Sequence, residues 1–164
     1  MKITSFKDMY IAEPQELVSV EEQLGAALSD MAEVASHPAL KEVLSKHAKQ
    51  TLTQKSRLES ILHKAGAIAD MHTDQAMQAL IAETKKMFVI LQGDDLRDAG
   101  LIASAQKLKH YEIAAYGTAA ALAGQLDLRA DQKLLHNSLE EEKQADALLT
   151  QLAKLEVNPD AVAA

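Results

Sequence analysis

The sequence contains no cysteine and no tryptophan, and aromatic residues make up only 3% of its 164 positions. The absence of cysteine excludes disulfide bonds and thiolate metal ligands, although it does not identify a compartment. Because aromatic and β-branched residues are the ones that strands favour, their scarcity argues against a β-sheet protein. Six glycines and three prolines are the only strong helix breakers.

Positive charge and long apolar runs are also scarce. Seventeen Lys and Arg face twenty-four Asp and Glu, for a net charge of −7, and no basic run reaches five residues. Nucleic acids and anionic membranes reward clustered Lys and Arg, so we expect neither as a partner. No stretch stays apolar for about 18 residues, and the N-terminus lacks the apolar core of a signal peptide. A cytoplasmic location is the default expectation.

The residues that are present favour helices. Hydrophobic residues make up 48% of the chain, and its bias toward Ala, Leu, Glu, Lys and Gln predicts an all-α protein. Its length suits one domain, which we place at residues 1–157, followed by a flexible tail at 158–164. Five helical segments are expected, at residues 5–35, 36–65, 73–92, 94–124 and 130–156.

Several residues mark the ends and breaks of these segments. Ser5 is a suitable N-cap for the first, and Pro14 is expected to kink or break it near residues 11–13. Ser36 or His37 should cap the second segment, with Pro38 in its first turn, and Gly66 should end it.

The spacing of the segments predicts the topology. Short links join the first segment to the second and the fourth to the fifth, so each pair should form an antiparallel hairpin. The link between the hairpins is long and carries its own helix. Two hairpins joined by a long crossover have the connectivity of a ferritin-like four-helix bundle.

The stretch LEEEKQAD, residues 139–146, places two acidic residues among leucines. Since each residue advances a helix by about 100°, Glu142 and Asp146 fall on the apolar side, beside Leu135, Leu139 and Leu149. Glu140 and Glu141 are expected on a solvated face.

The other long segments repeat this pattern. Glu21 and Glu112 lie within the apolar stripes of their segments, and His47 lies close to the stripe of the second. All are near mid-helix, so they should meet at one level. Buried carboxylates cost several kcal/mol each unless a cation, protons or water compensates them. A divalent ion held by carboxylates and imidazole is one solution. The alternative is that each acid pairs with a Lys or Tyr at the edge of the bundle.

Four stretches resemble one bacterial family. They are SVEEQLGAAL, HPALKEVLSKHAKQTLTQ, LIASAQKLKHYEIAAYGTAAALAGQL and LLHNSLEEEKQADALLTQLA, and they are similar in order and spacing to the YciE/YciF-like proteins, which are ferritin-like, stress-associated and of unknown function. The resemblance covers nearly the whole chain. It implies a four-helix bundle with a crossover helix, a homodimer, and a two-metal carboxylate site in some members.

The resemblance also assigns candidate ligands. The family's metal-site positions fall on Glu21, His47, Glu112, Glu142 and Asp146. Two departures stand beside them: the family typically has Glu where this chain has Gln50, and often Glu where it has Lys109. Gln50 is therefore a weak sixth ligand, and an inward Lys109 would upset the charge balance.

Two functional interpretations follow. The first is a partly degraded metal site that holds Fe, Mn or Zn, with one ion favoured over two. The second is a metal-free structural or interaction module, in which Lys109 or Lys55 and buried water neutralise the acids. Oxidase or ferroxidase chemistry requires a bound redox metal, so no catalytic residue is assigned, and no small-molecule substrate is identified. An iron-storage cage and a histidine phosphotransfer domain both fit poorly. His37, His63, His72, His110 and His136 are expected at the surface, in loops or at caps.

Overall fold

The computed structural model describes residues 2–69 and 73–164, and its described elements are all helical. Four long helices form the bundle: α1 (Phe6–Val34), α2 (Pro38–Ala65), α4 (Asp94–Gln125) and α5 (Arg129–Leu152). A shorter helix, α3 (Gln75–Ile90), carries the chain from one hairpin to the other. After α5 the chain continues through a π-helical turn, η1 (Ala153–Val157), into α6 (Asn158–Ala163). None of the helices described is long and apolar enough to cross a bilayer.

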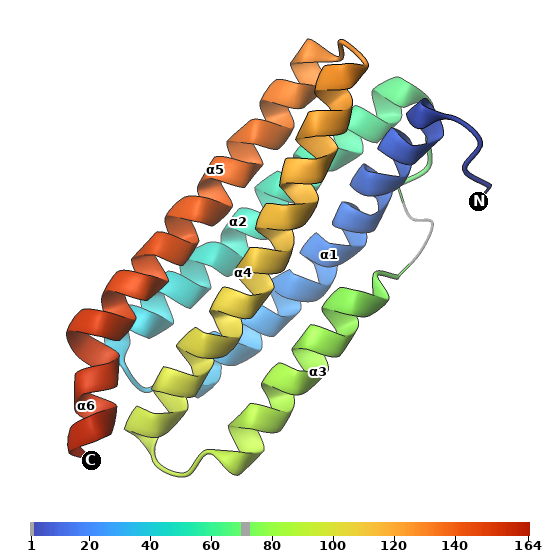
Figure 1. Ribbon diagram of the computed structural model, residues 1–164. Coiled ribbons are helices and arrows are strands. Elements are labelled where there is room, and N and C mark those ends of the chain that lie inside the picture. Colours follow the sequence, from blue (N-terminus) through green and yellow to red (C-terminus); the bar gives the residue numbers. More distant parts are fainter. Residues whose placement is uncertain (1, 70–72) are drawn as a thin grey trace.

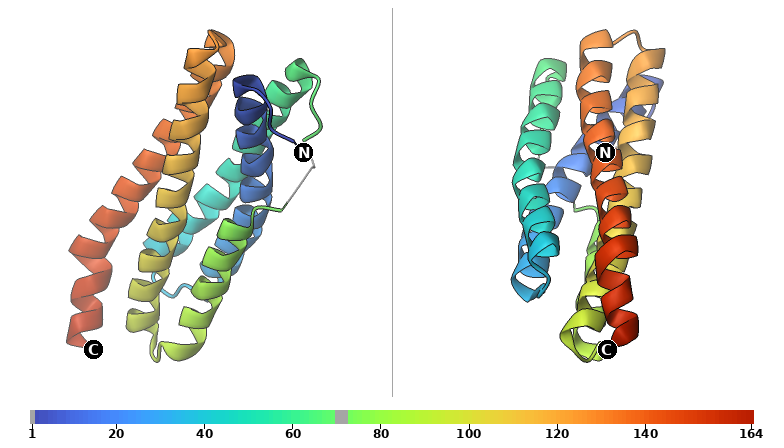
Figure 2. Two further views of the ribbon diagram at one scale, coloured as in Figure 1. Left: turned by 45° about the vertical axis from the view of Figure 1, so that its right-hand side comes forward. Right: turned by 90° about the vertical axis from the view of Figure 1, so that its left-hand side faces the viewer.

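The ferritin-like topology expected from the spacing is confirmed. Helices α1 and α2 pack as one antiparallel hairpin and α4 and α5 as the other, while α3 lies against α1 and α4 (Figure 1). Figure 2 shows the long helices side by side, with α3 on the flank of the bundle. His72 lies outside the described residues.

The predicted starts of the first two helices are correct in position, but the side chain that caps α2 belongs to another helix. Ser5 and Asp8 form a reciprocal capping box at the start of α1. His37 is the N-cap of α2, but the side chain that accepts from the backbone there is Asp98 of α4, 2.9 Å from the Ser36 nitrogen and 2.6 Å from that of His37. This long-range cap ties the two hairpins together at one end.

Two features of the helices differ from expectation. The first helix is continuous through Pro14, so the break expected there does not occur. Pro14 is buried, as are Tyr10 and Leu17 on the same helix, and the packing of α1 outweighs the lost backbone donor. Residues 158–163, expected as a frayed tail, form helix α6, which contacts α4. Gly66 ends α2 as predicted, with φ of 68°.

The apolar core consists of two separate clusters. One lies toward the end of the bundle at which the chain turns from α1 into α2, and includes Leu28, Leu44 and Leu149. The other lies toward the opposite end, and includes Tyr10, Leu62 and Leu135. Between them, the long helices contribute a band of buried polar side chains: Glu21, His47, Thr51, Gln54, Lys109, Glu112, Ser138 and Glu142.

Candidate functional site

Lys109 is the most unusual residue of this polar band. Its side chain is 1% exposed, and its ammonium donates to Glu112 Oε2 at 2.9 Å and to Glu142 Oε2 at 2.6 Å. Glu112 stands one turn further along α4, whereas Glu142 comes from α5, and both are as deeply buried as the lysine. The ammonium therefore lies between two carboxylates that helical spacing alone had placed in the core.

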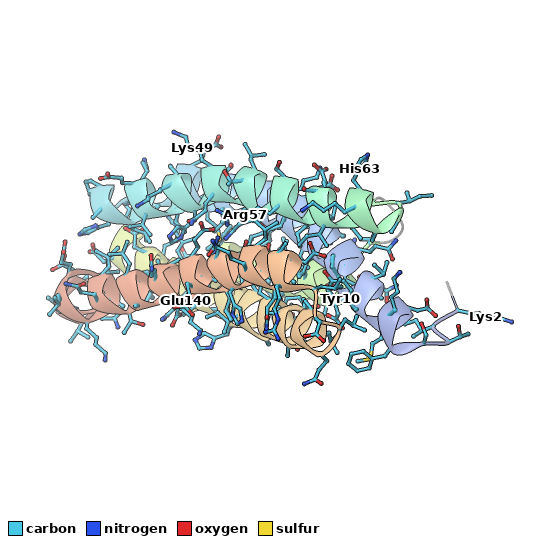
Figure 3. All side chains as sticks on the ribbon, turned by 90° about the horizontal axis from the view of Figure 1, so that it is seen from above. Lys2, Tyr10, Lys49, Arg57, His63 and Glu140 are labelled. Atoms are coloured by element: carbon cyan, nitrogen blue, oxygen red, sulfur yellow. The ribbon has the colours of Figure 1, made fainter. Side chains whose placement is uncertain are left out.

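Helix α2 extends this arrangement to the other hairpin. Gln54, on α2, donates from Nε2 to Glu142 Oε1 at 2.6 Å. Beside it, the Arg57 guanidinium donates to both oxygens of Glu141, at 2.6 and 2.8 Å. Figure 3 shows Arg57 in the space between α2 and α5, while Lys49 points away from it. The expectation that Glu141 is ordinary surface charge is wrong, because the carboxylate is part-buried and forms this two-bond pair.

The third acid is held by a tyrosine. The Tyr116 hydroxyl donates to Glu21 Oε1, and both side chains are buried. Four buried side-chain atoms of the band have no hydrogen-bond partner among the described residues: Glu21 Oε2, Glu112 Oε1, His47 Nδ1 and Gln54 Oε1. Buried acceptors of this kind are normally satisfied by ordered water or a ligand.

The electrostatics of the band favour a single buried negative charge. Burial raises the pKa of Glu21 to about 8, and burial also raises the pKa of Glu112 well above its usual range despite Lys109. For Glu142, Lys109 and the hydrogen bonds outweigh burial and lower the pKa. Burial would lower the pKa of Lys109, but Glu112 and Glu142 outweigh it and raise the pKa instead. The charged pair at neutral pH is therefore Lys109 with Glu142.

His47 lies in the same band as a neutral imidazole. Burial lowers its pKa to about 4, and the positive charge of Lys109 acts in the same direction. A neutral imidazole can accept a hydrogen bond or a metal ion at its unprotonated nitrogen. The Lys109 ammonium thus disfavours a second positive charge at His47 of α2.

The structure brings together four of the six predicted ligands and places two elsewhere. Glu21, His47, Glu112 and Glu142 all lie in the buried band. Asp146 instead accepts from Gln106 Nε2 at 3.1 Å and lies 3.3 Å from the exposed His110 imidazole. Gln50 is half-buried on α2.

These residues do not fit a divalent ion as they are arranged. Glu112 and Glu142 each direct an oxygen to the Lys109 ammonium, and a metal at that point would face a charge of the same sign. Within residues 2–69 and 73–164, with Lys109 in its native position, no group of three or more His, Asp or Glu side chains is arranged so that it could hold a metal ion. The assignment of these side chains as metal ligands remains a prediction.

Sequence reasoning did not identify Gln54 or the bond between Tyr116 and Glu21. Signals for both are present. Gln54 follows His47 by seven residues and so shares its face of α2, and Tyr116 follows Glu112 by four. Neither spacing indicates which acid the side chain reaches, because Tyr116 bonds to α1 and Gln54 bonds to α5.

Comparison with known proteins places this chain in a family. A family model described as a domain of unknown function, DUF892, matches residues 5–162. The protein YciF of Escherichia coli strain K12 is 37% identical over 162 residues, which is 98% of this chain and 98% of that protein.

Solved structures agree with this match. The crystal structure of the E. coli stress protein YciF superposes with a TM-score of 0.90, at 37% identity, covering 95% of this chain and 99% of that one. YcfI of Rhodopseudomonas palustris gives a TM-score of 0.88 at 30% identity, covering 91% and 95% of the two chains. A protein from Xanthomonas campestris, 14% identical with a TM-score of 0.75 and 92% of each chain covered, shares the fold.

Proposed function

Since this chain belongs to the DUF892 family, we propose that it is a stress-associated bundle that works through its surface, as a homodimer, with a lysine in place of metal at its centre. The association with stress comes from its relative YciF, which is described as a stress protein. No reaction is derived for the buried band, so the proposed role is structural or interactive and not enzymatic.

The observation that carries this proposal is the burial of Lys109 between Glu112 and Glu142. A buried lysine is costly unless a carboxylate compensates its charge. Here Glu142 does so, and Glu112 accepts a second hydrogen bond from the ammonium. Because the buried charges are paired within the protein, neither a metal ion nor water is needed to balance them.

One experiment separates this proposal from the metal-binding alternative. The protein is purified without chelator, its metals are measured, and Fe²⁺ or Mn²⁺ is titrated under anaerobic conditions while thermal stability is followed. We expect no stoichiometric metal and an unchanged melting temperature. Metal bound at micromolar levels with a raised melting temperature would refute the proposal, because a ligand specific to the folded state must stabilise it.

The alternative is favoured by one observation. Glu21 Oε2, Glu112 Oε1 and His47 Nδ1 are buried without partners among the described residues, and oxygen and imidazole donors are what iron, manganese and zinc take as ligands. If the titration succeeds, these atoms are the first candidates for the contacts.

The proposed dimer surface is a groove between α1 and α2. It has a volume of about 980 Å³ and is lined largely by small residues, including Gly25, Ala26 and Ala48. At Gly25 the two helices approach so closely that a Cβ would lie 2.8 Å from Thr51 Oγ1. Leu52, 70% exposed, stands at the edge of the groove. A groove of small residues with charged side chains along it suits the helices of a second copy.

The charges along the groove favour a second copy as the occupant. Glu33 lines it on α1, and Lys41 and Lys49 line it on α2. A two-fold axis parallel to the helices would place α1 of one copy over α2 of the other, at the same level along the bundle. Glu33 of each copy would then face Lys41 of the other, which is electrostatically complementary.

The oligomeric state tests this surface. Light scattering on the native protein should give the mass of a dimer, and Lys41→Glu should shift it toward monomer. Adding Glu33→Lys to that variant should restore the dimer, because the reversed charges again match. Lys64→Glu, at an exposed position of α2 outside the groove, is the control and should leave the dimer unchanged. A native monomer would refute the dimer.

A further inference from the structure

The contacts of Lys109 resemble those of a bound cation more than those of a packed side chain. Its ammonium receives one oxygen from α4 and one from α5, at 2.9 and 2.6 Å. Glu21 of α1 and His47 of α2 also interact electrostatically with Lys109 and with Glu142. Two helices thus bind the ammonium directly, and the other two contribute buried polar groups to the same band, as the helices of a bundle do around a bound ion.

Several oxygen and nitrogen atoms of this band could act as metal ligands and are not bonded to the lysine. Glu112 uses Oε2 for Lys109 and leaves Oε1 without a partner, and Glu21 likewise leaves Oε2. His47 Nδ1 and Gln54 Oε1 are the other two such atoms of the band. All belong to side chains at least nine-tenths buried. Carboxylate oxygen and imidazole nitrogen suit divalent ions such as Mn²⁺ and Zn²⁺.

We infer that Lys109 is the resident cation of this site: its ammonium excludes a divalent ion, and its removal leaves Glu21, His47, Glu112 and Glu142 able to take one up. This inference rests on the proposed function, in which the native centre is metal-free. The native contacts explain the exclusion. Two carboxylate oxygens that a metal would need are hydrogen-bonded to the ammonium, and a tethered charge of the same sign opposes the entry of an ion.

The test compares Lys109→Ala and Lys109→Gln with the native protein, using Mn²⁺ and Zn²⁺ as probes. Both variants remove the ammonium, and the alanine variant also leaves space. We expect each to bind about one ion per chain, at least about tenfold more tightly than the native protein, and to show a metal-dependent rise in melting temperature that the native protein lacks. Lys109→Arg keeps the positive charge and should bind no metal.

Two controls identify the site. Lys55→Ala also deletes one lysine that pairs with two glutamates, Glu22 and Glu59, but on the surface, so a mere change in net charge should produce no gain there. Glu142→Gln added to Lys109→Ala removes a proposed ligand and should abolish the gain. A gain that survives Glu142→Gln would place the metal elsewhere and overturn the inference.

The remaining outcomes are also decisive. Folded Lys109→Ala and Lys109→Gln that take up no metal, beside a metal-free native protein, would overturn this inference and leave the proposed function intact. Metal bound by the native protein would overturn the proposed function itself. If both variants unfold, refolding with Mn²⁺ or Zn²⁺ should restore helical circular dichroism, and failure to do so would count against the inference.

Discussion

The two ends of the bundle and its centre are built from the same four helices but by different physical means. At the ends, leucines and alanines pack against one another in two apolar clusters. At the centre, between the clusters, Lys109, Glu112 and Glu142 meet with less than 2% exposure of each side chain. Apolar contacts are non-directional and tolerate replacement, whereas each charge at the centre depends on a particular partner.

The two regions therefore differ in how strictly they specify their residues. The end clusters need only residues of suitable volume, so many sequences can supply them. The centre needs one lysine at one position, because two buried carboxylates converge there. Mutations should therefore have different signatures in the two regions, most clearly in how their effects depend on pH.

The largest effect is expected from Lys109→Met. The substitution keeps a long side chain but leaves Glu112 and Glu142 without their cation, and breaking a buried ion pair from one side costs about 3–5 kcal/mol. Denaturant unfolding at pH 7 measures the loss. It should shrink at acidic pH, where protonation of Glu142 removes the unpaired charge. An equal loss at both pH values would mean that packing, not charge, is what Lys109 contributes.

Leucines at the ends should be nearly as important, but without this pH dependence. Leu44→Ala in one cluster and Leu62→Ala in the other remove fully buried side chains, and each should cost about 2–5 kcal/mol. The free energy of unfolding, measured at pH 5.5 and pH 7.5, should fall by the same amount at both. A strongly pH-dependent loss at Leu44 would show that the clusters and the centre are energetically coupled.

A smaller effect is expected from titration of the centre alone. The pKa of Glu21 is about 8 in the folded protein, against 4.5 for an ordinary glutamate, with burial as the main cause. The folded state then binds more protons than the unfolded state, so stability falls as pH rises through this range. Between pH 6.5 and 8, Glu21 should account for about 2 kcal/mol of this decrease at most, so Glu21→Gln should make the slope shallower. Glu112, whose pKa is also raised, supplies the slope that remains.

The titration of His47 sets the lower limit, near pH 6.5, of the pH range in which the effect of Glu21 can be measured apart from that of His47. Its pKa is lowered to about 4 from 6.5, mainly by burial, so the unfolded chain takes up a proton before the folded one. This contribution to stability is lost as pH falls from 6.5 toward 4, which is opposite in sign to the effect of Glu21. Chemical denaturation across pH 6.5 to 8 therefore isolates the acids. An unchanged slope in Glu21→Gln would assign the pH dependence to another group.

The smallest effect is expected at Gln50. It is half-buried on α2, so Gln50→Glu should change the free energy of unfolding by less than about 0.5 kcal/mol, and the variant, like the native protein, should bind no Mn²⁺. Metal uptake by this variant would show that the ligand assignment drawn from the family resemblance applies despite Lys109. Thermal melts with and without Mn²⁺ measure both quantities.

Much of the fold could be predicted because its signals are local. Periodic leucines, the Ser5 cap, Pro38 and Gly66 mark the helices within a few residues, and the link lengths specify two hairpins and a crossover. The inward direction of Glu21, Glu112 and Glu142 follows from the same periodicity. The cap of α2 by Asp98 could not be read in this way, because that contact joins residues about sixty positions apart.

By itself, the sequence determined that Glu21, His47, Glu112 and Glu142 face the core near the middle of their helices, since a helix of 3.6 residues per turn projects its side chains at predictable angles. Only the tertiary structure decided how those residues pair. Lys109 lies at the margin of its helical face, and its long flexible side chain can turn to water or to the core. It turns inward because two helices bring Glu112 and Glu142 to a single point, and that convergence depends on how the helices pack.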